Sequence, residues 1–143
     1  MSLDPWHVLT ANYGHIAYPG TAFVTLLDCF LYLILTYNVG RARMKFGVPA
    51  TETGGPQDLM RIIRAHLNTL EQLAFHLPVL WVAALAVSDN FATLGGAVWL
   101  FARTLYAARY YQKANRRTKG FLISMIANMV LLIGAFCGVI ASF

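Results

Sequence analysis

The sequence carries little charge. Only 12% of its 143 residues are Asp, Glu, Lys or Arg, about half the share in an average soluble domain. Hydrophobic residues make up 58% of the chain, and the mean hydropathy is +0.56. This length excludes a large catalytic scaffold with a separate cofactor-binding lobe, and the composition excludes a soluble extramembrane domain. The composition therefore predicts an integral, multi-pass membrane protein.

Cysteine is also scarce. Cys29 and Cys137 lie far apart in apolar surroundings, without a Cys-x-x-Cys pair or a histidine at ligand spacing. No metal site is predicted, and the two thiols are interpreted as ordinary buried residues. The N-terminus contains Asp4 and lacks a basic segment before the first apolar run, so no cleaved signal peptide is expected.

Long apolar runs occur four times. They predict membrane-spanning helices at about residues 21–40, 59–87, 93–111 and 120–143, since about 20 apolar residues cross a bilayer as a helix. No internal repeat or long linker divides the chain, so residues 1–143 are expected to form a single domain. The predicted fold class is an all-α membrane protein, a four-transmembrane-helix bundle.

The basic residues gather in two of the three connections between these runs. The first connection and its helical flanks hold Arg41, Arg43, Lys45, Arg61 and Arg64, and the third holds Lys113, Arg116, Arg117 and Lys119. The opposite side carries only acids, Asp4 and Asp89. By the positive-inside rule both basic connections are predicted to be cytoplasmic, with both termini on the far side. The net charge of +5 is thus interpreted as a topology signal and not as a nucleic-acid surface.

Two predicted spans also carry charge at membrane depth, where each charged group costs roughly 3 kcal/mol or more. At 100° per residue, one face of the second span presents Arg64, Asn68 and Glu71, with Arg61 at its edge, and one face of the third presents Arg103, Tyr106, Tyr110 and Arg117. One glutamate cannot neutralise this many arginines. The two faces together predict a cationic cleft that binds an anionic ligand.

Two further residues have more than one interpretation. His66 lies on the opposite side of the second span from Asn68, so it either packs between helices or acts toward a neighbouring subunit. Asp28, alone in the first span, either hydrogen-bonds across helices or serves as the proton site of a small exporter.

The string Arg61-x-x-Arg64-x-His66-x-Asn68-x-x-Glu71, followed by Arg103-x-x-Tyr106-x-x-x-Tyr110 and a basic cluster, resembles the MAPEG family. These are membrane-associated proteins in eicosanoid and glutathione metabolism, and the likeness covers nearly the whole chain. The resemblance implies a homotrimer in the bacterial inner membrane or the endoplasmic reticulum. It also implies that glutathione binds between adjacent subunits and reacts with lipophilic electrophiles or hydroperoxides.

The resemblance further implies a role for each matching residue. Glutathione would be held by Arg64, Asn68, Glu71, Arg103, Tyr106 and Tyr110 of one subunit and by Arg43 and His66 of its neighbour. Arg117 would be the catalytic residue that stabilises the thiolate, with Arg116 and Lys119 as alternatives. Gln72 and Met44 differ from the leukotriene-forming members, which favours a general detoxifying transferase or peroxidase. A non-catalytic lipid-binding scaffold on the same fold is the alternative.

Overall fold

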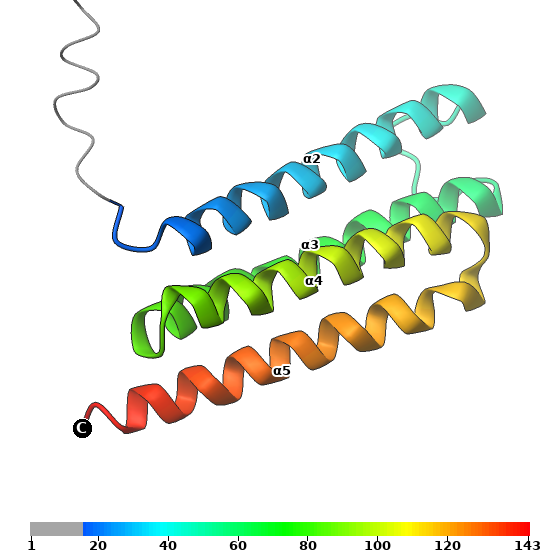
Figure 1. Ribbon diagram of the computed structural model, residues 1–143. Helices are drawn as coiled ribbons and strands as arrows, with labels where there is room; N and C mark the ends of the chain where they lie inside the picture. Colours follow the sequence, from blue (N-terminus) through cyan, green and yellow to red (C-terminus); the bar gives the residue numbers. More distant parts are fainter. Residues whose placement is uncertain (1–15) are drawn as a thin grey trace, which may run out of the picture.

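A computed structural model describes residues 16–143, so the predictions for Asp4 and the first residues lie outside the described part of the chain. Four long helices run up and down side by side, as Figure 1 shows. They are α2 (Pro19–Phe46), α3 (Gln57–Ala86), α4 (Asp89–Gln112) and α5 (Thr118–Ile140), with a 3₁₀ turn, η1 (Ala114–Arg117), between the last two. The predicted four-helix membrane bundle is confirmed.

Three segments are long and apolar enough to cross a membrane on their own composition: Pro19–Phe46, Gln57–Ala86 and Ala114–Ile140. The fourth helix, α4, has 24 residues and a length of about 36 Å, but its polar residues lower its hydropathy. Several of them, including Arg103 and Tyr106, are buried because α4 packs against α2, α3 and α5. These buried polar residues of α4 therefore face the interior of the bundle.

The outer surface of the bundle is apolar. Large side chains such as Phe23, Phe30 and Phe136 are more than half exposed in the single chain, as expected where lipid replaces water. Cys29 and Cys137 are exposed as well, so their interpretation as buried thiols was wrong. Helix periodicity explains the error, because both cysteines fall on faces that point away from the other helices.

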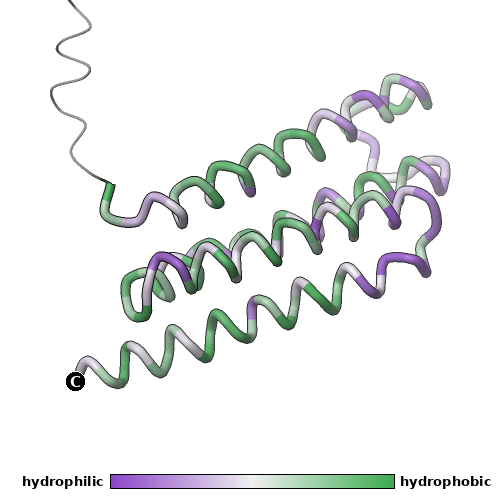
Figure 2. The backbone as a smooth tube through the Cα atoms, viewed as in Figure 1, coloured by the Kyte–Doolittle hydropathy of each residue, from purple (hydrophilic) through white to green (hydrophobic). Residues whose placement is uncertain are grey.

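Hydrophilic residues are concentrated at one end of the bundle, as Figure 2 shows. There α2 reaches Phe46, beyond the predicted end of the first span, and stops at Gly47, whose φ of 64° is left-handed. The start of α3, the end of α4 and η1 meet at the same end. We call it the basic end, because the two basic connections lie there.

At the opposite end, Asp89, the first residue of α4, forms hydrogen bonds to the start of α2. Its carboxylate accepts hydrogen bonds from the backbone N–H groups of Gly20 (3.0 Å) and Thr21 (2.8 Å) and from the Thr21 hydroxyl (2.7 Å). These donors, the Thr21 hydroxyl first among them, hold the pKa of Asp89 below its usual value. One acidic side chain thereby satisfies the free N–H groups at the start of α2 and ties α2 to α4.

A buried polar network crosses the interior between these two ends. Asp28 Oδ2 lies 3.4 Å from His76 Nε2, and both side chains are completely buried. His76 Nδ1 is hydrogen-bonded to Asn128 Oδ1 at 2.6 Å, and Asn128 donates to Gln72 Oε1 at 3.4 Å. We call Asp28, Gln72, His76 and Asn128 the paired network. The arrangement supports the structural interpretation of Asp28, because its partner comes from a neighbouring helix.

Candidate functional site

A group of polar and aromatic side chains gathers toward the basic end. It consists of Asn68, Arg103, Tyr106, Tyr110 and Arg117, which we call the arginine cluster. Three of its members come from one face of α4, because Arg103, Tyr106 and Tyr110 follow each other at spacings of three and four residues. The predicted polar face of the third span therefore faces other helices and not lipid.

Arg103 is completely buried, as is Tyr106. Its guanidinium carbon lies 4.1 Å above the centre of the Tyr106 ring, and Nη2 donates to Thr69 Oγ1 at 2.7 Å. Nε and Nη1 are buried and have no hydrogen-bond partner in the described part of the chain. A buried guanidinium with two unused donors is costly unless a ligand supplies acceptors.

Arg117 reaches the arginine cluster by a different route from the one predicted. It does not continue the face of the third span, because α4 ends at Gln112 and Lys113 is extended, with φ −159° and ψ 137°. Arg117 is instead the last residue of η1, immediately before α5. The turn brings it back, so that its guanidinium carbon lies 4.7 Å from the centre of the Tyr110 ring, while the side chain stays exposed.

A cavity of about 340 Å³ opens at the arginine cluster. It is lined by Asn68, Tyr106, Arg117, Thr118 and Phe121. The Tyr106 hydroxyl donates to Asn68 Oδ1 at 3.3 Å, which links α4 to α3 across the cavity. The volume lies within the usual range for a small-molecule site, and one wall is apolar while the rest is polar or cationic.

Gly120 allows α5 to lie close to α4 beside the cavity. A Cβ atom at this position would lie 2.6 Å from the backbone nitrogen of Tyr106 and 2.8 Å from the carbonyl oxygen of Ala102. Only glycine therefore lets the start of α5 approach α4 this closely. The same approach places Arg117 and Phe121, on either side of Gly120, next to the aromatic side chains of α4.

Four of the predicted site residues, Arg43, Arg64, His66 and Glu71, do not line this cavity. Arg64 and Glu71 are exposed on α3. His66 stacks on Tyr32 at 4.8 Å, and its Nε2 lies 3.1 Å from Thr36 Oγ1 of α2. Arg43 donates to the carbonyl oxygens of Pro49 (2.7 Å) and Glu52 (3.1 Å) in the following loop. Within one chain, His66 and Arg43 therefore belong to α2 and its surroundings and not to the arginine cluster.

Among residues 16–143, the arginines of the cluster form no salt bridge. Across residues 16–143, the salt bridges join Arg61 to Asp58 and His76 to Asp28. Neither Arg103 nor Arg117 has a carboxylate of the described residues within salt-bridge distance. A partly dehydrated site with two such guanidinium groups favours an anionic ligand.

Sequence reasoning missed three residues of this site. Thr69, which accepts from Arg103, and Thr118 and Phe121, which line the cavity, carried no charge that marked them. Phe121 lies four residues after Arg117, a spacing that places two side chains on one side of a helix and could have identified it.

Comparison with known proteins finds a matching family model and several relatives of similar length. The MAPEG family model matches residues 21–137. An uncharacterised protein of Synechocystis is 46% identical over 119 residues, which cover 83% of this chain and 87% of the relative. Leukotriene C4 synthase of Bos taurus is 36% identical (85% of this chain and 81% of the relative), and microsomal glutathione S-transferase 2 of Mus musculus is 32% identical (85% and 83%). The family model and these relatives show that the chain belongs to the MAPEG family.

Proposed function

We propose that the chain is a glutathione-dependent transferase or peroxidase that acts on lipophilic electrophiles or hydroperoxides within a membrane. The observation that carries the proposal is the arginine cluster. Within residues 16–143, its two guanidinium groups lack a carboxylate at salt-bridge distance, and one of them, Arg117, lines a cavity at the basic end. Relatives of this chain bear the names microsomal glutathione S-transferase 2 and leukotriene C4 synthase, and the first of these names glutathione as a substrate.

The charges of glutathione complement the residues present. The tripeptide has two carboxylates, one ammonium group and a thiol. Arginine is the residue best suited to bind carboxylates, because its planar group donates two parallel hydrogen bonds. Arg64 and Arg103 supply such donors, and Glu71 supplies an acceptor for the ammonium group. Asn68 and the hydroxyl groups of Tyr106 and Tyr110 add uncharged hydrogen bonds.

The positions of His66 and Arg43 favour a site shared between subunits. Both side chains lie on the α2 side of the subunit, away from its own arginine cluster. In a homotrimer, the α2 side of one subunit would face the cluster of the next. His66 and Arg43 would then reach the bound glutathione from the neighbour, and both basic connections would lie on the cytoplasmic side.

Arg117 is proposed to stabilise the reactive thiolate. Lowering a thiol pKa by two or three units requires roughly 3 to 4 kcal/mol of preferential stabilisation. A single positive charge at contact distance near a protein surface provides about 4 kcal/mol. In conjugation, the thiolate sulfur forms a bond to the electrophilic carbon, and the leaving group departs with the bonding electrons. In peroxide reduction, the thiolate sulfur forms a bond to the terminal oxygen, and the O–O bond breaks with its electron pair on the departing alkoxide, which takes up a proton. A second glutathione then reacts with the glutathione sulfenic acid to give glutathione disulfide and water.

The surroundings of Gln72 favour general detoxification over leukotriene chemistry. Gln72 follows Glu71, yet it donates to Met125 Sδ at 3.3 Å and accepts from Asn128 at 3.4 Å. It therefore belongs to the paired network and contributes nothing to the cavity. The lipophilic substrate would then meet the Phe121 side chain, the apolar wall of the cavity, beside the thiolate, and an apolar contact without a specific hydrogen bond suits a broad range of electrophiles.

The test is an ultraviolet difference spectrum of glutathione mixed with the purified protein at neutral pH. The wild type should show a thiolate band, and Arg117→Ala should lose it while still binding glutathione. Arg116→Ala, which removes the adjacent arginine of η1, is the matched control and should keep the band. If neither a band nor glutathione binding is found in the wild type, the enzyme proposal fails and the lipid-binding scaffold replaces it.

A further inference from the structure

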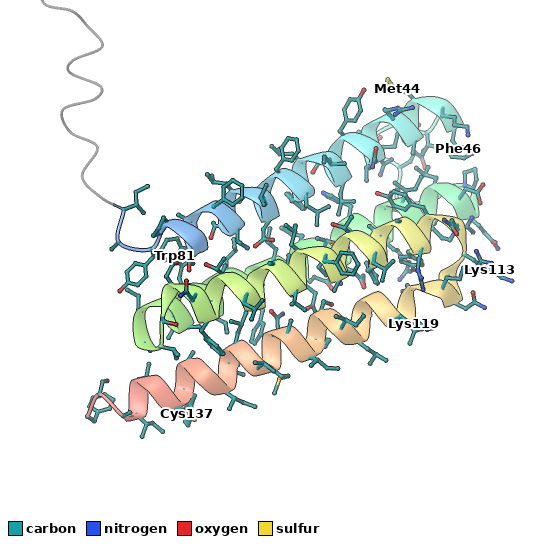
Figure 3. All side chains as sticks on the ribbon, in the orientation of Figure 1. Met44, Phe46, Trp81, Lys113, Lys119 and Cys137 are labelled. Atoms are coloured by element: carbon teal, nitrogen blue, oxygen red, sulfur yellow. The ribbon has the colours of Figure 1, made fainter. Side chains whose placement is uncertain are left out.

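A second cavity lies at the basic end, between α2, the first turns of α3 and the last turn of α4. Its volume is about 450 Å³. Polar groups come from Asn38, Arg41 and Lys45 on α2 and from Tyr111 on α4, while Phe46 and Ile62 form an apolar wall. Phe46 lies at the same end of the bundle as Lys113 and Lys119, as Figure 3 shows. We call this space the α2–α4 cavity.

The α2–α4 cavity has a surplus of positive charge. Its one acidic residue, Asp58, forms a salt bridge with Arg61, and Arg61 Nε also donates to the carbonyl oxygen of Tyr111 at 3.4 Å. Both cations lie over aromatic rings: the guanidinium carbon of Arg41 is 5.9 Å from the centre of the Tyr37 ring, and Lys45 Nζ is 5.5 Å from the centre of the Phe46 ring. Within residues 16–143, neither cation has a carboxylate partner.

A hydroxyl donor adds to the two cations. Asn38 Nδ2 donates to the Tyr111 hydroxyl oxygen at 3.5 Å, which leaves the hydroxyl hydrogen of Tyr111 for another acceptor. The cavity therefore offers two positive charges and an O–H group to a ligand, beside an apolar wall. A phosphate group attached to an apolar body matches this combination.

The α2–α4 cavity is separate from the proposed glutathione site. On α2, Arg41 and Lys45 lie roughly 180° around the helix from Tyr32, Thr36 and Arg43, at 100° per residue. The latter group is the side that carries His66 and that a neighbouring subunit would use. A ligand in the α2–α4 cavity thus meets the opposite flank of α2.

The depth of the cavity points to the source of the phosphate. Arg41 and Lys45 follow directly after the apolar run of residues 21–40, where the hydrocarbon region ends and lipid headgroups begin. Cations at this depth attract anionic lipids, by about 1 kcal/mol for each residue. We propose that the α2–α4 cavity binds the phosphate headgroup of an anionic phospholipid, with Phe46 and Ile62 against its glycerol and upper acyl carbons.

Native mass spectrometry of the protein in a neutral detergent tests the proposal, with phosphatidylglycerol and phosphatidylcholine as probes. The wild type should bind phosphatidylglycerol more tightly than phosphatidylcholine. Arg41→Gln/Lys45→Gln should weaken phosphatidylglycerol binding about 20- to 30-fold, about fivefold for each cation. Arg41→Lys, which keeps the charge, should bind nearly as the wild type does. Glutathione binding should be the same in all of these variants, which also shows that they are folded.

The matched control is Lys113→Gln/Lys119→Gln, which removes two cations from the same end but from outside the cavity. It should bind phosphatidylglycerol within about twofold of the wild type. An equal loss in this control would overturn the proposal in favour of nonspecific attraction to the basic end. Displacement of the lipid by glutathione would place the cavity within the glutathione site and also overturn it. Binding of inorganic phosphate without any preference for phosphatidylglycerol would assign the cavity to a soluble anion instead.

Discussion

The paired network and the arginine cluster lie in one bundle, about two helical turns apart along α3. They differ in whether their charged side chains have a partner of opposite charge. In the paired network, Asp28 faces His76 at 3.4 Å, and Asn128 holds the other nitrogen of the imidazole ring. In the arginine cluster, the contacts of Arg103 are with the Thr69 hydroxyl and the Tyr106 ring. Within residues 16–143, the paired network brings an acid and a base together, whereas Arg103 and Arg117 have no carboxylate at salt-bridge distance.

This difference separates structural polar groups from functional ones. Asp28 and His76 face each other as a carboxyl group and an imidazole ring, so the pair needs no net charge. Neutral pairs hold helices together in a bilayer without needing anything from outside. Among residues 16–143, Arg103 has no such partner, so the cost of burying its guanidinium group is offset when an anion binds, and the exposed Arg117 adds a second unpaired charge beside it. The unpaired charges, more than the buried ones, mark the candidate site.

The largest expected effect comes from breaking the paired network. His76→Phe should lower the free energy of unfolding by about 3 to 5 kcal/mol, because Asp28 then remains buried without a partner. Detergent-induced unfolding followed by circular dichroism measures this loss. The double variant Asp28→Leu/His76→Phe should recover most of it, since an apolar pair replaces a buried polar pair at little cost. A single variant as stable as the wild type would show that the two residues are not coupled.

The second effect concerns the packing beneath the arginine cluster. Gly120→Ala should destabilise the bundle by about 1 to 3 kcal/mol, because the new Cβ meets the backbone of α4 at Tyr106 and Ala102. It should also weaken glutathione binding, since α5 carries Phe121 and follows Arg117. Thermal unfolding and glutathione titration measure the two losses.

Gly40→Ala is the matched control for Gly120→Ala. Gly40 lies in α2, where a Cβ would have nothing within 4 Å. The substitution should stabilise α2 by about 0.5 to 1 kcal/mol through helix propensity alone. Equal effects at both glycines would contradict the close contact between α4 and α5.

The third prediction separates stability from binding at Arg103. Arg103→Met removes an uncompensated charge and keeps much of the side-chain volume, so the free energy of unfolding should change by less than about 1 kcal/mol. Glutathione affinity should fall at least tenfold, which corresponds to about 1.4 kcal/mol. Isothermal titration calorimetry measures the affinity. Arg109→Met, on the same helix but outside the cluster, should leave it unchanged; a strong loss of stability in Arg103→Met would instead make Arg103 a structural residue.

The sequence predicts the bundle well because its four apolar runs are long and its turns contain proline, glycine or charge. It also predicts that Arg103, Tyr106 and Tyr110 share a face, since helix periodicity suffices within one uninterrupted helix. Periodicity failed for Arg117, because a single extended residue, Lys113, ends α4 and a turn restores the contact with Tyr110. The contact between Arg117 and Tyr110 depends on tertiary packing, which helix periodicity does not describe.

The sequence alone did not predict the pairing of Asp28 with His76 either. The two residues are 48 positions apart, and the sequence alone gives each of them an apolar neighbourhood. Only the packing of α2 against α3 brings them together. A contact between two helices depends on how each helix is rotated about its axis and shifted along it, and hydropathy determines neither. The same reason left the Arg103 partner, Thr69, unrecognised.

The smallest expected effect tests the end of the bundle beyond the paired network, where Asp89 caps α2. Its donors hold the pKa of Asp89 below the usual value, so the carboxylate is the form that the folded state favours. This stabilisation is present above the unfolded pKa of about 3.9 and is lost as the pH falls through the lower folded value. Between pH 6 and pH 3 the melting temperature of the wild type should therefore fall more than that of Asp89→Asn. The difference between the two melting temperatures should narrow toward the acidic end, as the Asp89 carboxylate takes up a proton. Glu52→Gln, which removes an exposed carboxylate from the basic end, should follow the wild-type profile; if it abolished the pH dependence as well, general charge rather than the cap on α2 would be responsible.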